Sequence, residues 1–259
     1  MKHLISIELK KALSIKFFIV SMVLIFGPLI VITPIINGSY SFFRPIEVHA
    51  QLISSSSISL LFPIFLVALY ANSYANEKEE NFLLYVKPRT NISKYVLAKG
   101  FVNATVTFIV AFLMIFIPFV FVQYIDPALS IIQYETTFYQ PVSVGTFEFL
   151  AERSVLLYGL VYSLWVAVNG VLYVSVAYLL SICIKNRFVA LSVPFLWWFI
   201  MNFVTGVLGI ESFSPIFSVF PFLIATQPIW TAFIPFAIII LTIVSLCIYI
   251  KSKEIVWND

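Results

Sequence analysis

The residues best suited to chemistry in this sequence are the charged side chains between positions 76 and 100, here called the charged segment. It reads NEKEENFLLYVKPRTNISKYVLAKG and separates two long apolar runs, in a chain where only 10% of residues are charged. Along the segment, carboxylates come first, an apolar run follows, and basic residues around Pro88 come last. A segment with this order of groups can bind the charged and apolar surface of a partner protein. The simpler interpretation is that the segment is a solvated loop. The candidate contact residues are Glu77, Glu79, Glu80, Phe82, Leu83, Tyr85, Lys87 and Arg89.

Proline sets the expected local structure of this segment. The residue before a proline is pushed out of helical geometry, so a helix that begins near Glu77 is expected to stop by Lys87. Thr90 or Asn91 can then cap a second helix that leads into the next apolar run. The pattern predicts a short amphipathic helix, a turn, and a helix that enters the membrane.

Catalytic and metal-binding patterns are absent from the sequence. It contains no G-x-x-x-x-G-K-[ST], H-E-x-x-H, C-x-x-C or G-x-S-x-G. The only histidines, His3 and His49, are expected on opposite sides of the membrane, which excludes a shared histidine metal site. Cys183 and Cys247 are expected to be unpaired residues in helices. We therefore expect no enzyme activity, cofactor or metal in this chain.

The composition indicates an integral membrane protein. Hydrophobic residues make up 61% of the 259 positions and the mean hydropathy is +1.04, far above the soluble range. The net charge of +3 is too small, and too concentrated beside the apolar runs, to suggest nucleic-acid binding. A single transmembrane domain over 1–259 is expected.

Apolar runs of about 20 residues, the length that crosses a bilayer, occur six times. The sequence thus predicts an all-α polytopic protein with six transmembrane helices. The Ser-rich start of the second span can equally belong to the loop before it. The spans are expected at 17–36, 52–74, 101–122, 155–184, 188–209 and 229–250.

Two further segments have an expected place at the membrane. Residues 2–16 form a basic amphipathic helix that suits the interface, although they can also be the frayed start of the first span. The run between the fifth and sixth spans is apolar but broken by prolines, so it is expected to be a broken segment on the outer side. Those prolines are Pro215, Pro221 and Pro228.

The distribution of basic residues predicts the orientation. With the N-terminus inside, Arg44 and Arg153 are the only basic residues outside, which places both termini in the cytoplasm. The span centres contain no ionisable residue, so proton or sodium coupling lacks its usual carriers. Asn103, Asn169 and Asn202 are expected to form hydrogen bonds between helices.

Small residues at four-residue spacing mark one face of the fourth span. Gly159, Ser163 and Ala167 allow another helix to approach closely. The partner is either a helix of the same chain or a second subunit.

These features together resemble the permease subunit of ABC-2 type transporters. The resemblance rests on the basic interfacial helix, six spans, the proline-broken outer segment and the stretch NEKEENFLLYVKPRTNISKYVLAKG after the second span. The family often has Gly-Thr after the acidic cluster, where this chain has Asn81 and Phe82. The charge order of the segment is nevertheless kept.

The resemblance implies that 76–100 is a coupling segment docked on a separate cytoplasmic ATPase, which carries ATP and magnesium. Glu77, Glu79 and Glu80 would then meet basic residues, and the apolar run from Phe82 to Val86 would fill a cleft. Lys87 and Arg89 would bind carboxylates or lipid phosphates.

The expected protein is therefore the membrane subunit of an ATP-driven exporter in the bacterial cytoplasmic membrane. Its partners would be ABC ATPase subunits, the lipid bilayer and a second permease, identical or not. The cargo would be hydrophobic or amphipathic, such as a peptide or a lipid. The alternative is a membrane scaffold that recruits a cytoplasmic partner through 76–100 and transports nothing.

Overall fold

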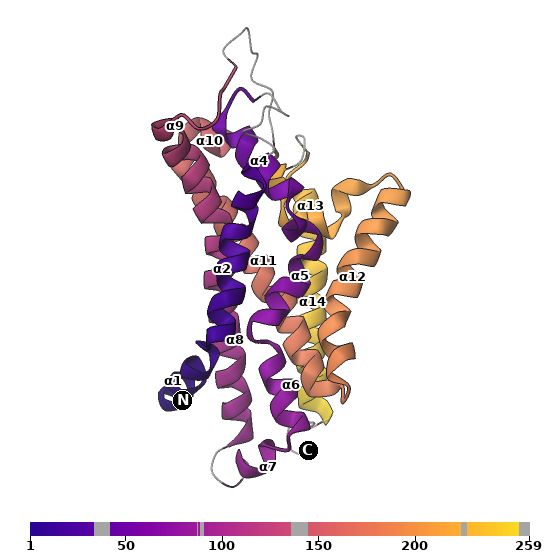
Figure 1. Ribbon diagram of the computed structural model, residues 1–259. Coiled ribbons are helices and arrows are strands. Elements are labelled where there is room, and N and C mark those ends of the chain that lie inside the picture. Colours follow the sequence, from indigo (N-terminus) through magenta and orange to yellow (C-terminus); the bar gives the residue numbers. More distant parts are fainter. Residues whose placement is uncertain (34–41, 87, 89–90, 136–144, 224–226, 254–259) are drawn as a thin grey trace.

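The computed structural model of the chain describes residues 1–33, 42–86, 88, 91–135, 145–223 and 227–253. Within these residues the regular elements are helices, and an isolated parallel bridge joins Phe42 to Tyr134. The long helices run side by side in one elongated bundle (Figure 1). The all-α class expected from the sequence is confirmed.

The helices follow one another along the chain with short connections. Their bounds are α1 Lys2–Ala12, α2 Ile15–Ile30, α4 Pro45–Ser55, α5 Ser57–Tyr70, α6 Asn72–Glu79, α7 Leu83–Val86, α8 Ile92–Val120, η1 Phe121–Ile125, α9 Asp126–Leu129, α10 Phe149–Arg153, α11 Val155–Cys183, α12 Arg187–Val207, η2 Glu211–Phe213, α13 Pro215–Val219, η3 Pro221–Leu223 and α14 Trp230–Lys253.

Several of these helices are long and apolar enough to cross a membrane. Four helices are long and apolar enough on their own: α8 with its continuation to Leu129, α11, α12 and α14. Two further pairs of helices reach a membrane-spanning length only when both members are counted together across a bend. These pairs are α1 with α2, bent by 70°, and α4 with α5, bent by 60°. The described part of the chain therefore has four such helices, or six if each bent pair is one span, as expected of a membrane-spanning protein.

Polar side chains fix the starts of the long helices. The side-chain oxygen of Asn91 accepts the backbone N–H of Ser93 at 3.0 Å and caps α8, as the sequence predicted for one of two candidates. The other candidate, Thr90, lies outside the described residues. The same role is played at α2, α11 and α12 by Ser14, Ser154 and Asn186.

The predicted spans 17–36 and 52–74 leave residues 37–51 as an expected loop, but the second half of this stretch is helical. Helix α4 starts at Pro45, and proline is pre-organised for the first helical position. The extended backbone of Ser56, with ψ of 145°, then separates α4 from α5. The predicted second span is thus composed of the end of α4, all of α5 and the start of α6.

The segment between α12 and α14 is broken as its prolines predicted. Pro215 stands at the start of α13, Pro221 begins the short η3, and neither is inside a long helix. The side chain of Trp165 on α11 donates a hydrogen bond to the carbonyl of Ser218 at 2.8 Å. Protein therefore covers part of this irregular backbone.

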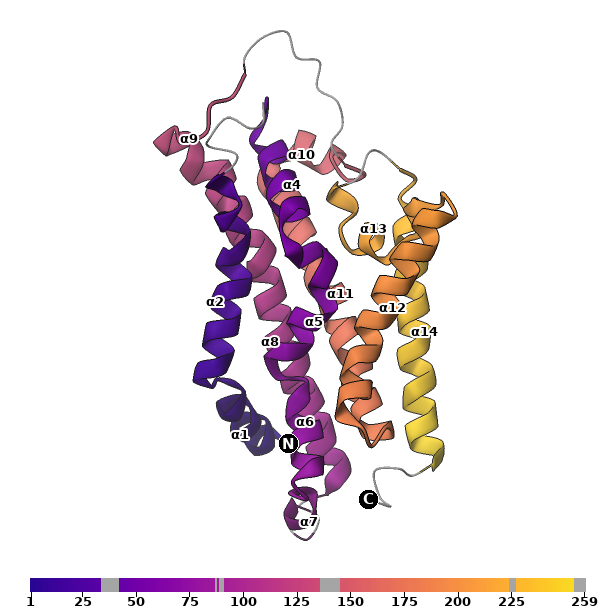
Figure 2. The same cartoon turned by 45° about the vertical axis from the view of Figure 1, so that its right-hand side comes forward.

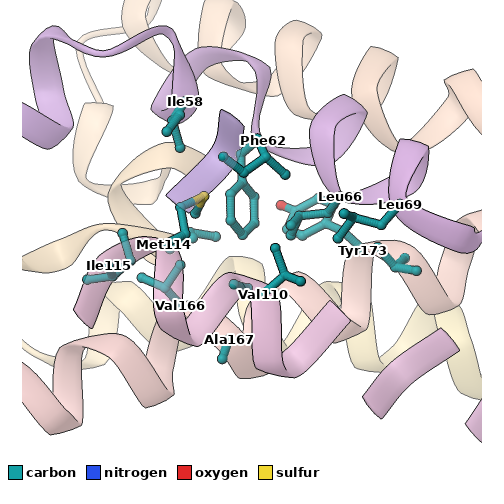
Figure 3. Packing of buried hydrophobic residues seen from close by; sticks show 14 of the residues in the cluster. Ile58, Phe62, Leu66, Leu69, Val110, Met114, Ile115, Val166, Ala167 and Tyr173 are labelled. Atoms are coloured by element: carbon teal, nitrogen blue, oxygen red, sulfur yellow. The ribbon is translucent and has the colours of Figure 1, made fainter. Parts of the chain in front are cut away.

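The core of the bundle lies where α5, α8 and α11 meet. Phe62 of α5 points toward Met114 of α8 and Val166 of α11, in a cluster of fully buried apolar side chains (Figure 3). In Figure 2, α2 lies on one side of this core and α12 and α14 lie on the other. The outer helices therefore expose much of their apolar surface, as lipid-facing helices do.

The small-residue face of α11 packs inside the chain. A Cβ built on Gly159 would lie 2.2 Å from a ring carbon of Phe119 on α8, so the ring occupies the space that a side chain would need. Ser163 and Ala167 on the same face are fully buried. Within this chain, the close partner of the face is α8.

Candidate functional site

The charged segment lies at one extremity of the bundle, here called the charged end. Helices α1, α6 and α7 and the start of α8 gather there, while α4, α9 and α10 lie at the opposite end (Figure 1). The first twelve residues and the segment from 76 to 100 are thereby brought together, although they are far apart in the sequence.

The charged segment is shaped by an asparagine, and the expected single helix from Glu77 to Lys87 is wrong. Helix α6 ends at Glu79, and Asn81 takes the left-handed conformation with φ of 57°. The N–H of Phe82 bonds to the carbonyl of Glu77 at 2.9 Å, and the N–H of Asn81 bonds to the carbonyl of Lys78 at 3.2 Å. These two bonds define a Schellman motif, for which asparagine is suited because it tolerates positive φ.

The three carboxylates of the segment have different surroundings. Glu77 turns inward, where its side chain is only 14% exposed and pairs with Lys99. Glu79 is exposed and pairs with Arg187 at 3.1 Å, whereas Glu80 is exposed at the end of α6. Of the three, Glu79 and Glu80 are therefore the ones exposed at the surface.

The apolar residues of the charged segment also differ in how far they are exposed. Leu83 is buried in a cluster with Tyr74, Tyr95, Tyr178 and Ile182, and this contact anchors α7 to α8 and α11. Its neighbours point outward and are exposed, with Tyr85 at 70%. The charged end of the bundle therefore has an exposed apolar surface, here called the α7 tip, formed by Phe82 directly before α7 and by Leu84 and Tyr85 within it.

The basic turn of the segment was expected to supply further contacts. Lys87 and Arg89 lie outside the described residues, and Pro88 between them is exposed.

Beneath the α7 tip lies a buried group of charges, here called the ionic cluster. Lys99 pairs with Glu77 and lies 3.4 Å from Glu8, and both Lys99 and Glu8 are only 1% exposed. Lys11 closes the group at 2.8 Å from Glu8 and 3.4 Å from Glu77. Two carboxylates thus face two ammonium groups, and their formal charges cancel.

Two tyrosines supply the remaining hydrogen bonds of the ionic cluster. Tyr70 at the end of α5 donates to Glu8 at 2.8 Å, and Tyr95 on α8 donates to Glu77 at 2.6 Å. Buried charges are tolerated only when paired and hydrogen-bonded, and this group meets both conditions. The cluster therefore joins α1, α5, α6 and α8 at a single point.

The ion pairs also change the acid–base behaviour of α1. Burial alone would raise the pKa of Glu8, but Lys99, Lys11 and the Tyr70 hydroxyl outweigh it and hold that pKa below its ordinary value. Burial likewise acts to lower the pKa of Lys11, and Glu8 and Glu77 raise it above its ordinary value. Both groups are therefore charged near neutral pH.

Sequence reasoning missed the ionic cluster as a unit. Neither Glu8 nor Lys99 was among the candidate contact residues predicted from the sequence. One local signal was present, because Glu8 and Lys11 are three residues apart and can pair on a helix. The pairing of Glu8 with Lys99 is a tertiary contact that no local pattern contains.

The charged segment is also tied to the helices beyond α8. Lys78 donates to the carbonyl of Ile182 at the end of α11, at 3.0 Å. Arg187 at the start of α12 donates to Asn76 at 3.0 Å and pairs with Glu79. Segment 76–100 is therefore connected to α1, α11 and α12 by ion pairs and hydrogen bonds.

A groove begins directly beside these contacts. It encloses about 670 Å³ between α5, α6 and α12. Asn72, Asn76 and Arg187 line the part nearest the charged end, and apolar side chains line the remainder, including Ile64, Val67, Leu191 and Phe195. An amphipathic molecule matches this lining.

The described residues contain no group of three or more His, Cys, Asp or Glu side chains that could hold a metal ion. In the same part of the chain, Cys183 and Cys247 are free thiols.

Comparisons with protein-family models, with curated proteins and with solved structures find no match to this chain. The fold and composition define its class as a helical protein with several helices able to span a membrane.

Proposed function

We propose that this chain is the transmembrane permease subunit of an ATP-driven ABC exporter of the ABC-2 type. The observation that carries the proposal is the α7 tip, an exposed apolar surface that directly follows α6, which the ion pair of Glu77 with buried Lys99 holds against α8. Such a surface is suited to a cleft on a separate ATPase, with Glu79 and Glu80 beside it as charged contacts.

The contacts around the tip supply a route for mechanical coupling. Helix α7 directly follows α6, and α6 contacts α8 and α1 through Glu77, which pairs with Lys99 and Lys11. It contacts α12 through Glu79, which pairs with Arg187. Because α8 packs closely on α11, movement of the charged segment passes into the core of the bundle. ATP and magnesium belong to the ATPase in this scheme.

The architecture supports the remaining parts of the proposal. If each bent pair is one span, six spans place both termini on the side of the charged end, and the bias of basic residues makes that side cytoplasmic. The groove between α5 and α12 suits a hydrophobic or amphipathic cargo, and a second permease copy, identical or different, would complete the path. The bacterial cytoplasmic membrane is the corresponding location.

The first test is recovery of an ATPase with the tagged protein from its native membrane. We expect a soluble P-loop ATPase at near-equal stoichiometry, identified by mass spectrometry, and its loss in a Tyr85→Ala variant. Tyr249→Ala is the matched control, because Tyr249 is also exposed and belongs to the last two turns of α14. The C-terminal end of α14 lies toward the charged end (Figure 1).

Two outcomes contradict the proposal. Recovery of a partner that is not an ATPase, through the same α7 tip, would favour a membrane scaffold that transports nothing. Equal ATPase recovery with Tyr85→Ala and with the wild-type chain would remove the α7 tip as the docking surface.

A further inference from the structure

The groove between α5, α6 and α12 has a polar end and an apolar end. Asn72 and Asn76, one turn apart on α6, line the polar end together with Arg187 at the start of α12. Apolar side chains of α5 and α12 line the remainder, along helices apolar enough to cross a membrane. Ile64 and Leu196 belong to this lining and are exposed, so the groove opens on the outer surface of the bundle. A molecule of the membrane can therefore enter it from the side.

Arg187 has N–H groups that the protein does not use. Its Nη1 donates to the side chain of Asn76 at 3.0 Å, and the same nitrogen lies 3.1 Å from a carboxylate oxygen of Glu79. Among the described residues, none accepts a hydrogen bond from Nε or Nη2 of Arg187. These two nitrogens form the planar fork that binds two oxygens of a phosphate or a carboxylate at once. The Arg187 side chain is 52% exposed and lines the groove, so an anion in the groove can reach the fork.

Further donors near the fork distinguish a phosphate from a carboxylate. The two oxygens of a fatty-acid carboxylate would be satisfied by the fork alone. The side-chain amides of Asn72 and Asn76 add N–H groups at the same end, and the hydroxyl of Ser192 lines the groove further along α12. A phospholipid has acceptors for all of these donors, because its ester oxygens follow its phosphate toward the acyl chains. The polar lining therefore fits a phospholipid better than a fatty acid.

From these observations we propose that the groove binds a phospholipid from the leaflet at the charged end, held by its phosphate. The phosphate accepts hydrogen bonds from the free fork of Arg187 and from the amides of Asn72 and Asn76. The acyl chains lie along the apolar lining that Val67 and Phe195 contribute. The role of this lipid as cargo rests on the proposed function, whereas lipid binding itself does not and is measured on the chain alone.

Binding of a phosphate also acts on Glu79. A second anion on the guanidinium of Arg187 competes with the Glu79 carboxylate for the same positive charge, which weakens the pair that joins α6 to α12. Glu79 is one of the exposed carboxylates beside the α7 tip. A phospholipid in the groove therefore makes Glu79 more available to a partner.

The test uses phosphatidylglycerol with a photoreactive group in one acyl chain, added to the purified chain in dodecyl maltoside, a detergent without phosphate. We expect crosslinks in peptides that contain residues 64–68 and 191–196. Unlabelled phosphatidylglycerol should reduce them several-fold. Diacylglycerol with the same chains, oleate and inorganic phosphate should not, because each lacks either the phosphate or the chains.

Two results of this experiment contradict the proposal. Equal competition by diacylglycerol or oleate would mean unselective annular lipid, and equal competition by inorganic phosphate would mean an anion site without selectivity for lipid. Absence of crosslinks from both peptides would leave a second copy of the chain as the better occupant. If crosslinking occurs but no ATPase is recovered from the native membrane, only the proposed function fails.

Substitution of Arg187 tests the fork. Arg187→Gln removes a charge-assisted bidentate contact, so we expect phosphatidylglycerol to bind at least about tenfold more weakly. Lys185→Gln is the matched control, because it removes the same charge two residues earlier, at an exposed side chain that does not line the groove. Arg187→Lys should restore binding only in part, since an ammonium group lacks the fork. Equal binding by the Gln variants of Arg187 and Lys185 would overturn the proposal.

A second variant separates phosphate binding from a purely structural role of Arg187. Glu79→Gln breaks the same ion pair from its other side and leaves the fork intact, so we expect phosphatidylglycerol to bind as tightly as before or more tightly. If Glu79→Gln weakens binding as much as Arg187→Gln does, Arg187 only holds α12 to α6 and the proposal is wrong. If Arg187→Gln does not fold, Asn72→Leu, which removes an exposed amide from the groove, should weaken binding, and unchanged binding would overturn the proposal.

Discussion

The two ends of the bundle are held together by different forces. At the charged end, Glu8, Glu77 and Lys99 fix α1 and α6 to α8 through buried ion pairs. Toward the opposite end, rings interlock: Tyr162 of α11 stacks on Phe222 at 4.2 Å between centroids, and His49 of α4 meets Tyr162 edge to face at 5.6 Å.

This difference shows how a membrane protein can position a surface for a partner. Buried ion pairs depend on each member, and here they fix α1 and α6 against α8, next to the α7 tip that Leu83 anchors. Aromatic packing depends on shape and close approach instead, although the opposite end also has an ion pair, between Arg44 and Glu148. The two regions should therefore respond to different kinds of substitution.

The largest effect is expected from removing the central cation of the ionic cluster. Lys99→Met leaves Glu8 and Glu77 buried with one cation fewer, and losing one partner of a buried pair costs about 3–5 kcal/mol. The measurement is the free energy of unfolding in detergent. Lys94→Met is the control, because Lys94 is one turn earlier on α8 but exposed. Equal stabilities of the two variants would show that the cluster is not structural.

A smaller effect is expected from the close helix contact on α11. Gly159→Ala places a Cβ where the Phe119 ring now lies, and overpacking of this kind costs about 1–3 kcal/mol. Gly206→Ala on α12 is the control, since no atom lies within 4 Å of the added Cβ. A longer variant, Gly159→Leu, should disturb the packing further. Unchanged stability of both Gly159 variants would remove this face from the comparison.

The smallest effect is expected from acid. The pKa of Glu8 in the folded chain lies below its unfolded value, so its stabilising contribution is complete above the unfolded pKa, about 4.3. The contribution is lost as the pH falls through the lower, folded pKa. Unfolding measured from pH 6 down to pH 3 should therefore show a loss of stability that Glu8→Gln reduces. An identical pH profile for this variant would assign the loss to other groups.

Much of the fold could be predicted, because membrane insertion imposes strong local constraints. A bilayer requires runs of about 20 apolar residues with internally bonded backbones, so 155–184 and 188–209 were recognised within a few residues of α11 and α12. The predicted helix boundaries were wrong where a single residue sets the backbone conformation. Asn81 ends α6 early, and Pro45 begins α4 inside an expected loop.

The candidate site was predicted less completely. Composition located the charged segment but did not show which side chains face outward, since that depends on how α6 and α7 turn against α8. Glu77 and Leu83 point inward, whereas Tyr85 points outward, although all three belong to the same short run.

The sequence by itself determined the helical class, the apolar lengths and the charged segment, because these follow from local composition and spacing. Only the tertiary structure decided that Glu8 meets Lys99, that Phe119 covers Gly159, and that Leu83 is buried between α8 and α11. The physical reason is that each of these contacts joins helices distant in the chain or depends on the space between them. Neither is encoded in any local pattern.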